Sequence, residues 1–217
     1  DITSNQGILY DSNVFAATKY DMTVSSFYND STNLVCWYKF DNGGLTTDSS
    51  GSLINTLTNV NTVTYVAEYK RGNACVQFNG SSYLQITNEG RFSPNAFTIV
   101  CWVKLVQNTS ADVITIASCR DGSGGVSSGW ALYIKNSTNN LEVWCMNGSY
   151  NGLNVSVYNK FATNVWRHLA VTFSTAGTAS IEVFVDGTSV YTGTRGYTRC
   201  TTRYMRIGAG APESDTP

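Results

Sequence analysis

The sequence has few charged residues and a single histidine, and it lacks long apolar runs. Only 13% of its 217 residues are charged, and the formal net charge is −1. Phosphate binding needs a concentrated basic surface, so we expect no nucleic-acid ligand. No apolar run approaches the roughly 20 residues that cross a membrane as a helix, and no window repeats apolar residues at sustained helical spacing. We therefore expect neither a membrane span nor a helical architecture in this chain.

The six cysteines do not form a zinc-binding pattern. No C-x-x-C pair occurs, and one histidine is too few for most mixed Cys/His sites. Six thiols allow fifteen complete pairings, and the sequence does not choose among them. Cys36 and Cys101 fit small buried positions, whereas Cys119, Cys145 and Cys200 lie near predicted strand ends, where a bridge is sterically easier. We favour free or partly paired thiols over three disulfides.

The residues that are abundant favour strands. Tyr, Phe, Trp, Thr and Val are frequent, and Gly, Asn and Ser interrupt the sequence at short intervals. This composition is typical of an all-β protein with many turns. The chain length suits one domain with a substantial core.

The clearest local pattern spans residues 166–187. Apolar and polar residues alternate over 166–173, as they do in a strand with one buried face. Residues 174–178 are turn-forming, and the alternation resumes over 181–187, which ends in Asp-Gly. The pattern predicts an antiparallel hairpin.

This W-R-H-L-A-V-T-F and I-E-V-F-V-D-G pair resembles the laminin-G-like group of concanavalin A-like lectin/glucanase domains. Further blocks fit the family in its order: an opening strand at 34–41, a D-x-S-G loop at 47–51, an F-N-G hairpin at 75–86, an F-T-I-x-x-W-V-K strand at 97–104, and later strands at 130–134 and 206–208. The resemblance implies an all-β fold, a two-sheet antiparallel jelly-roll sandwich. It is more specific for the fold than for a ligand.

The resemblance divides the chain into three parts. We expect an N-terminal connector or added edge strand at 1–33, a laminin-G-like sandwich at 34–210 and a tail at 211–217. The sequence begins at Asp1 without a visible secretory signal, and it stops where the family usually continues through a final strand. We therefore expect a processed or excised piece of a larger polypeptide or assembly.

Related sandwiches include glycosidases, whose chemistry needs two carboxyl groups about 5 to 9.5 Å apart. Glu182 and Asp186 are four residues apart on one predicted strand, which separates their backbones by around 13 Å. Glu142 lies at what we predict to be an outward, solvated strand position. His168 is the one candidate imidazole base, and a structural role is favoured for it. We expect no catalysis, with a glycoside hydrolase as a distant alternative.

The candidate ligand-binding residues follow a predicted strand and enter a polar, Gly-containing loop. Sugar recognition combines an aromatic face with nearby amides and carboxylates. The candidates for carbohydrate binding are Trp144, Asn147, Tyr150 and Asn151. The alternative is an ordinary hairpin with a buried Trp144. The other tryptophans match core positions of the resembling family: Trp37, Trp102, Trp130 and Trp166.

The resemblance also implies a calcium ion, which many laminin-G-like sandwiches hold near a loop. Asp48 in the D-S-S-G loop best matches a family calcium position, and Asp41 lies close in sequence. Calcium prefers six to eight oxygen ligands, and the family's usual C-terminal acidic partner is missing. Calcium at Asp41 and Asp48 is therefore an open expectation.

We expect a non-catalytic, lectin-like module that binds a glycan or a protein surface. A structural or cell-adhesion domain without sugar binding is the alternative. The expected location is extracellular, on a cell surface or on the surface of a virus particle. A basic cluster near the C-terminus is either solvated surface or a site for an acidic glycan or acidic protein patch: Arg195, Arg199, Arg203 and Arg206.

Overall fold

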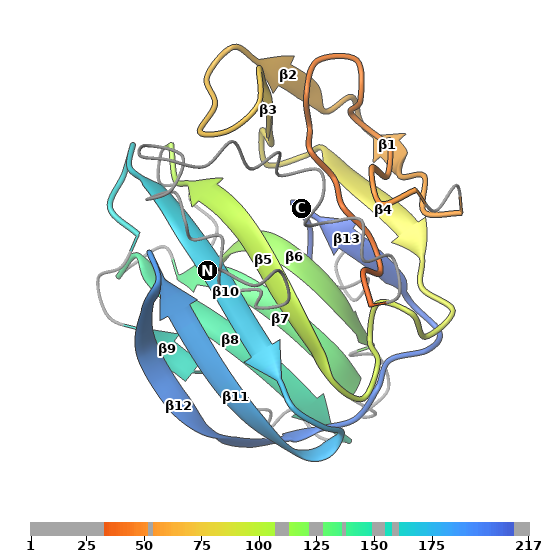
Figure 1. Ribbon diagram of the computed structural model, residues 1–217, viewed down its shortest axis with the longest axis vertical. Coiled ribbons are helices and arrows are strands. Elements are labelled where there is room, and N and C mark those ends of the chain that lie inside the picture. The colour runs from red at the N-terminus through yellow and green to blue at the C-terminus, as the bar shows by residue number, and fades with distance from the viewer. Residues whose placement is uncertain are drawn as a thin grey trace, which may run out of the picture.

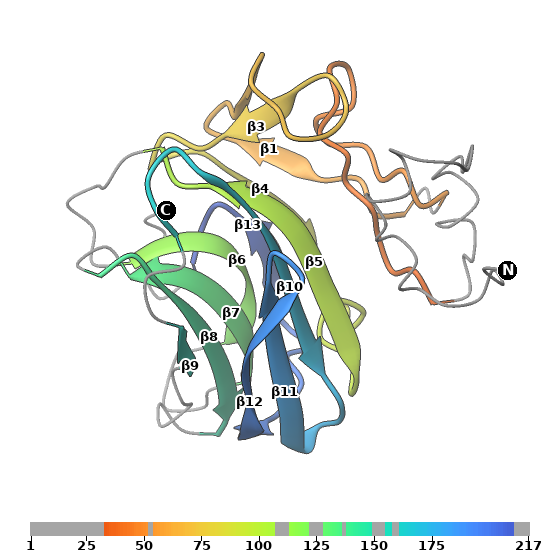
Figure 2. The same cartoon turned by 60° about the vertical axis from the view of Figure 1, so that its left-hand side comes forward.

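The computed structural model describes residues 33–51, 54–106, 113–121, 128–135, 138–148, 155–157 and 161–210, with 155–157 as backbone only. The strands of this part of the chain form two stacked sheets and a small separate ribbon (Figures 1 and 2). Every strand pairing is antiparallel. The structure confirms the expected all-β jelly-roll sandwich. Residues 1–32 of the connector expected at 1–33, and the tail expected at 211–217, lie outside the described residues.

The larger sheet has seven strands. In spatial order they are β1 (Thr58–Val60), β4 (Tyr83–Thr87), β13 (Tyr204–Ile207), β6 (Val113–Asp121), β7 (Ser128–Lys135), β8 (Asn140–Asn147) and β9 (Val155–Val157). The smaller sheet comprises β12 (Thr188–Tyr197), β11 (Gly177–Val185), β10 (Trp166–Phe173) and β5 (Phe97–Lys104). The ribbon pairs β2 (Thr64–Val66) with β3 (Cys75–Gln77) and lies at the top of the view in Figure 1.

The hairpin predicted from the sequence is β10 and β11, with Leu169 opposite Val185. The next turn, from β11 into β12, contains only Asp186 and Gly187, whose φ angles are 53° and 79°. Positive φ at both central residues defines a type I′ turn, which matches the twist of an antiparallel pair. Asp-Gly is a favoured sequence for this turn.

The core lies between the two sheets and is centred on aromatic rings. Phe97 stacks on Phe173 with ring centroids 4.3 Å apart, and Tyr197 and Trp130 pack against the same cluster. The Trp130 indole N–H donates to the carbonyl of Phe92 at 2.8 Å, which satisfies its one polar atom. Burial of these rings stabilises the stacking of the two sheets.

The expectation that the other tryptophans fill the core is right for Trp130 and wrong for the rest. On β5, the alternate residues Phe97, Ile99 and Cys101 face the core, so Trp102 lies on the outer face. Trp37 and Trp166 also lie outside the core cluster.

Two further strand predictions are wrong. Residues 34–41 form no strand. The amide of Trp37 donates to the Asp48 side chain and its carbonyl accepts from the amide of Ser49, so the backbone of Trp37 is hydrogen-bonded to a loop and not to a strand. The predicted hairpin at 75–86 consists of β3 and β4, which belong to different sheets. The Asn79 side chain accepts from the amide of Ser81 at 2.9 Å and stabilises the turn between them.

Candidate functional site

The outer face of the seven-stranded sheet carries aromatic and charged side chains together. Strand register aligns five residues of five neighbouring strands in one row across this face: Gln85, Arg206, Ser118, Ala131 and Trp144. The neighbouring strands β6, β7 and β8 bend along their length (Figure 2). The centre of this face is here called the Trp144 patch, and it consists of Arg120, Tyr133, Glu142, Trp144 and Met146.

The side chains of the Trp144 patch contact one another directly. The rings of Tyr133 and Trp144 meet edge to face with centroids 5.2 Å apart. The Trp144 indole N–H donates to Glu142 Oε2 at 3.0 Å, and the Arg120 guanidinium carbon lies 5.7 Å from the Trp144 ring centroid. Arg120 also donates to the Met146 sulfur at 3.8 Å. One indole is thus fixed by a carboxylate, a guanidinium and a second aromatic ring.

Most of the Trp144 patch is shielded from bulk water although it faces away from the core. Tyr133 is 3% exposed, Glu142 4% and Arg120 8%, whereas Trp144 remains partly exposed. The prediction that the Glu142 side chain projects outward is therefore right, and the prediction that it is exposed to solvent is wrong. A carboxylate at this depth needs hydrogen-bond donors, and the indole N–H supplies one.

The chain leaving β13 borders the same face. Ser118 Oγ donates to the carbonyl of Ala209 at 2.9 Å, and Arg206 donates to the carbonyl of Gly210 at 3.3 Å. Arg206 also lies over the Tyr83 ring, 4.9 Å from its centroid. Two arginines, Arg120 and Arg206, are therefore held on one face with their planar guanidinium groups in fixed orientations.

These groups have the chemistry that oligosaccharides require. An aromatic ring covers the apolar face of a pyranose, while guanidinium and carboxylate groups bond its hydroxyls. Trp144, Arg120 and Glu142 provide all three types, with both charged groups next to the indole.

The structure separates two of the predicted binding residues, Trp144 and Asn147. Asn147 has the opposite strand parity to Trp144, so the two side chains project from opposite faces of β8. The Asn147 side chain instead abuts Gly196 of β12. Tyr150 and Asn151 lie outside the described residues. Their roles, and that of Asn147, stay predictions.

The two aspartates proposed for calcium lie in loops that precede β1 and are fixed by hydrogen bonds. Asp48 accepts from the amide of Trp37 at 2.8 Å, from the amide and hydroxyl of Ser50, and from the Asn55 side chain at 2.9 Å. Asp41 accepts from the amide of Asn73 at 3.1 Å. A calcium ion at Asp48 would have to displace donors that already use both carboxylate oxygens. Among the described residues, no group of three or more His, Cys, Asp or Glu side chains gathers. Calcium binding stays a prediction.

A second surface feature lies on the outer face of the four-stranded sheet. It is an open hollow of about 410 Å³, lined by Thr172, Ser174, Ser180, Ile181, Glu182, Thr192, Gly193 and Thr194. Its one carboxylate, Glu182, accepts from the Ser189 hydroxyl at 2.7 Å. Hydroxyls dominate this lining and no aromatic ring contributes to it, so it offers hydrogen bonds without a stacking surface.

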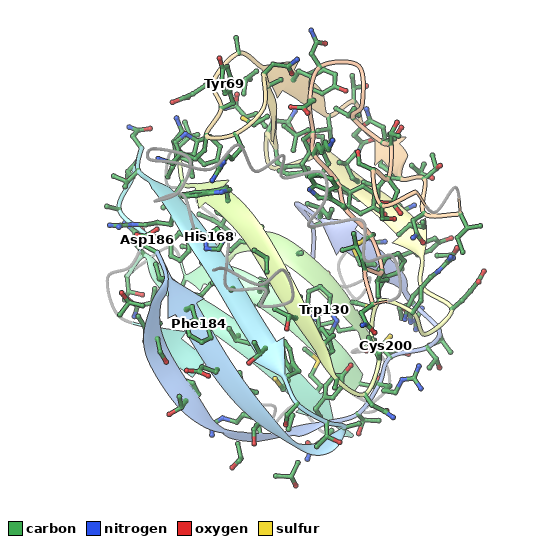
Figure 3. The ribbon with its side chains drawn as sticks, viewed as in Figure 1. Tyr69, Trp130, His168, Phe184, Asp186 and Cys200 are labelled. Carbon is green, nitrogen blue, oxygen red and sulfur yellow. The ribbon has the colours of Figure 1, made fainter. Side chains whose placement is uncertain are left out.

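His168 lies on the same outer face, near one end of β10 (Figure 3). Its ring meets Trp102 edge to face, with centroids 5.0 Å apart. Its backbone amide donates to Asp186 at 2.9 Å, and Asp186 also pairs with Arg167. Burial, helped by the nearby Arg71, holds the pKa of His168 below its usual value, and the Asp186 charge only partly opposes this.

Acidification should therefore destabilise the protein through His168. Because the histidine pKa is lower in the folded state, the unfolded chain binds more protons below about pH 6.5, and stability falls as the pH decreases. The lowered pKa of Asp186 contributes only near and below about pH 4. We expect the melting temperature to fall between about pH 8 and pH 5, and to fall less in His168→Gln. Parallel pH profiles of the two proteins would contradict this assignment.

Arg120 and Tyr133 were not predicted from the sequence, and Arg206 was predicted only as part of a basic cluster near the C-terminus. Each lies on a predicted or obvious strand, and alternation along W-A-L-Y-I indicates that Tyr133 faces away from Trp130 and Leu132. Nothing in the sequence, however, indicates that β13, β6, β7 and β8 lie side by side.

No helix in the part of the chain that the structure describes is long and apolar enough to cross a bilayer. No curated protein matches the sequence significantly.

Several solved structures share the fold. Domain 4 of AbnA, an extracellular GH43 arabinanase from Geobacillus stearothermophilus solved with arabinotriose, is 21% identical with a TM-score of 0.53, over 82% of this chain and 84% of that one. A structure of botulinum neurotoxin type C, whose cell entry depends on two ganglioside molecules, is 16% identical with a TM-score of 0.54, over 86% and 44%. The botulinum neurotoxin DC binding domain in complex with rat synaptotagmin II is 15% identical with a TM-score of 0.55, over 83% and 45%. This chain thus spans less than half of either toxin chain.

Sequence similarity identifies the family directly. The profile described as the concanavalin A-like lectin/glucanases superfamily matches residues 78–217, which include every strand from β4 to β13. The two stacked antiparallel sheets agree with that match. The chain belongs to the concanavalin A-like lectin/glucanase superfamily.

Proposed function

We propose that this chain is a glycan-binding module and that the Trp144 patch contacts the sugar. The observation that carries the proposal is the direct contact of Trp144 with both Glu142 and Arg120 on the outer face of the larger sheet. The partly exposed indole provides a stacking surface, and the largely buried charged groups beside it hold it in a fixed orientation. Preorganised polar groups gain affinity because little side-chain freedom is lost on binding.

The hollow on the four-stranded sheet is a weaker candidate. Its Ser and Thr hydroxyls hydrogen-bond well to water, so exchanging water for sugar hydroxyls there gains little. The partly exposed indole of Trp144 adds apolar contact area, which favours association.

The proposed role is non-catalytic. Glycoside hydrolysis generally uses two carboxyl groups on either side of the scissile bond. Within the described strands of the larger sheet, Glu142 is the one carboxylate whose register places it on the outer face. Asp121, at the end of β6, directly follows the outward-facing Arg120, so its side chain projects from the opposite face of the sheet. Its carboxylate pairs with Arg203 at 3.2 Å. One carboxylate supports binding better than hydrolysis.

The relatives of known structure are consistent with this role outside the cell. The arabinanase domain is part of an extracellular enzyme and was solved with an oligosaccharide, and the type C toxin depends on gangliosides. We propose an extracellular or surface location for this chain as one module of a larger protein, and we retain calcium as a cofactor to be tested by melting with calcium against chelator.

The Trp144→Ala variant is expected to lose glycan binding. The wild-type chain would be screened on an array of oligosaccharides that includes arabinotriose and sialylated glycans, and the affinity for the best probe measured by calorimetry. Loss of a central aromatic contact should weaken binding about 30-fold, or about 2 kcal/mol. The measurement is the dissociation constant of wild type and variant for the same sugar.

Trp102→Ala is the matched control, because it removes a partly buried tryptophan from the outer face of the other sheet. It should leave glycan affinity unchanged. Equal losses in the two variants would reject the Trp144 patch as the site, and a folded wild-type chain that binds no glycan on the array would reject the function.

A further inference from the structure

Two cysteines that are far apart in the sequence meet inside the sandwich. Cys119 lies on the core face of β6, and Cys200 lies in the link between β12 and β13 (Figure 3 labels Cys200). Both side chains are fully buried, and their thiols are joined by a hydrogen bond. Cys119 and Cys200 are the only two of the six cysteines, all of which are described, that share such a bond.

The link that carries Cys200 is firmly held in place. The Cys200 amide donates to Ser93 Oγ at 2.9 Å, and its carbonyl accepts from the Asn88 side chain. The neighbouring Arg199 donates to the carbonyls of Ser93 and Gly90 at 2.9 and 3.0 Å. The backbone therefore presents the Cys200 sulfur to β6 in one position.

The atoms around the two cysteines are also closely packed. A Cβ atom placed on Gly129 of β7 would lie 2.8 Å from the Cys200 Cβ and would overlap the Cys119 carbonyl oxygen. Only a residue without a side chain lets the link approach β6 this closely. Contact between the two thiols is thus built into the sheet rather than left to mobile side chains.

We propose that Cys119 and Cys200 form a disulfide in the mature protein and that the other four cysteines remain thiols. The bond would join the middle of the seven-stranded sheet to the link that enters it from the four-stranded sheet. It closes a long loop of the chain, which is the arrangement that most restricts the unfolded state. This inference does not depend on glycan binding.

The environments of the two sulfurs differ in a way that favours the reaction. The hydrogen bond from Cys119, together with donors at Arg203, Thr202 and Ser128, lowers the pKa of Cys200 to about 6 against the effect of burial. The same hydrogen bond and burial raise the pKa of Cys119. Cys200 is therefore the thiolate that attacks first.

The oxidant is a small-molecule disulfide such as glutathione disulfide. The Cys200 thiolate attacks one of its sulfurs, forms a mixed disulfide and releases one glutathione thiolate. Cys119 then attacks the Cys200 sulfur, which forms the internal bond and releases the second glutathione. The two protein thiols lose two electrons to the oxidant, and their protons pass to the two released thiolates. Because both sulfurs are buried in the closed core, the exchange takes place while the core is still partly open and the two thiols are already in contact.

The chain would be refolded with a mixture of reduced and oxidised glutathione, alkylated in denaturant without reduction, digested and analysed by mass spectrometry. We expect one cross-linked peptide pair containing Cys119 and Cys200, with the other four cysteines alkylated. Reduction in denaturant followed by refolding under reducing conditions should lower the melting temperature by about 10 °C.

The variants Cys200→Ser and Cys145→Ser distinguish the effect of the Cys119–Cys200 disulfide from the effect of replacing any buried thiol. Cys145 is also fully buried on the core side of the larger sheet, so its replacement is matched in burial. Cys145→Ser should keep the effect of reduction on melting, and Cys200→Ser should abolish it. Alkylation of all six cysteines in the refolded wild type, or a bridge from either cysteine to a different partner, would overturn the proposal.

Discussion

Replacement of Gly129 by alanine is expected to destabilise the fold by more than about 4 kcal/mol. Gly129 has a φ of +93°, a conformation that costs a residue with a side chain about 1 to 3 kcal/mol. The new methyl group would overlap the Cys119 carbonyl oxygen and lie 2.8 Å from Arg120 Cα, both of which are backbone atoms of the paired strand β6. Such overpacking costs about 1 to 3 kcal/mol, and more where the backbone must move. The expected loss is a large share of a typical domain's stability.

The Gly148→Ala variant separates the conformational cost of a positive φ angle from the cost of overpacking. Gly148 has nearly the same φ, +95°, but a Cβ atom there would meet nothing within 4 Å. We expect this variant to show only the conformational cost, about 1 to 3 kcal/mol. Urea unfolding of both variants measures the difference. If Gly129→Ala were no worse than Gly148→Ala, the close approach of the link, β6 and β7 described here would be wrong.

Replacement of Phe173 by alanine is expected to cost about 3 to 5 kcal/mol. Phe173 is 2% exposed, stacks on Phe97 and contacts Tyr197, so its removal leaves a cavity between the sheets. Because rings of both sheets meet there, the walls of the cavity can collapse only if the sheets shift. The free energy of unfolding from chemical denaturation checks the magnitude.

Phe184→Ala is the matched control for this substitution. Phe184 lies on β11, next to β10, but projects from the outer face and is only partly buried (Figure 3). Its removal exposes little new surface and opens no cavity, so the loss should be less than half that of Phe173→Ala. A larger loss for Phe184→Ala would mean that the inner and outer faces of the smaller sheet are assigned the wrong way round.

The fold was predictable because the hairpin of β10 and β11 can be recognised from local sequence signals alone. Alternation sets the faces, and the Asp-Gly turn sets the entry to β12. The assignment of Trp102 to the core failed because it followed family positions instead of the local pattern. Phe97, Ile99 and Cys101 already place the even-numbered neighbours on the outer face.

The site was only partly predictable, because it depends on contacts between strands. Trp144 was visible as an aromatic residue near a strand end, but Arg120 reaches it from β6, two strands away in the sheet. The register between β6 and β7 shifts between Thr115 and Ala117, and a shift of one residue moves every later side chain to the other face. That irregularity puts Arg120 on the face of Trp144, and no turn or alternation signal in the sequence reveals it.

The most direct test of the account is to locate a bound oligosaccharide by NMR. Each of the five tryptophans gives one indole N–H signal, and that of Trp144 is held against Glu142. Titration with the best array probe should shift the Trp144 indole signal and the amides of β6, β7 and β8 while leaving β10 and β11 unchanged. Shifts confined to Thr172, Glu182 and Thr192 would place the sugar in the hollow on the opposite sheet and contradict the account.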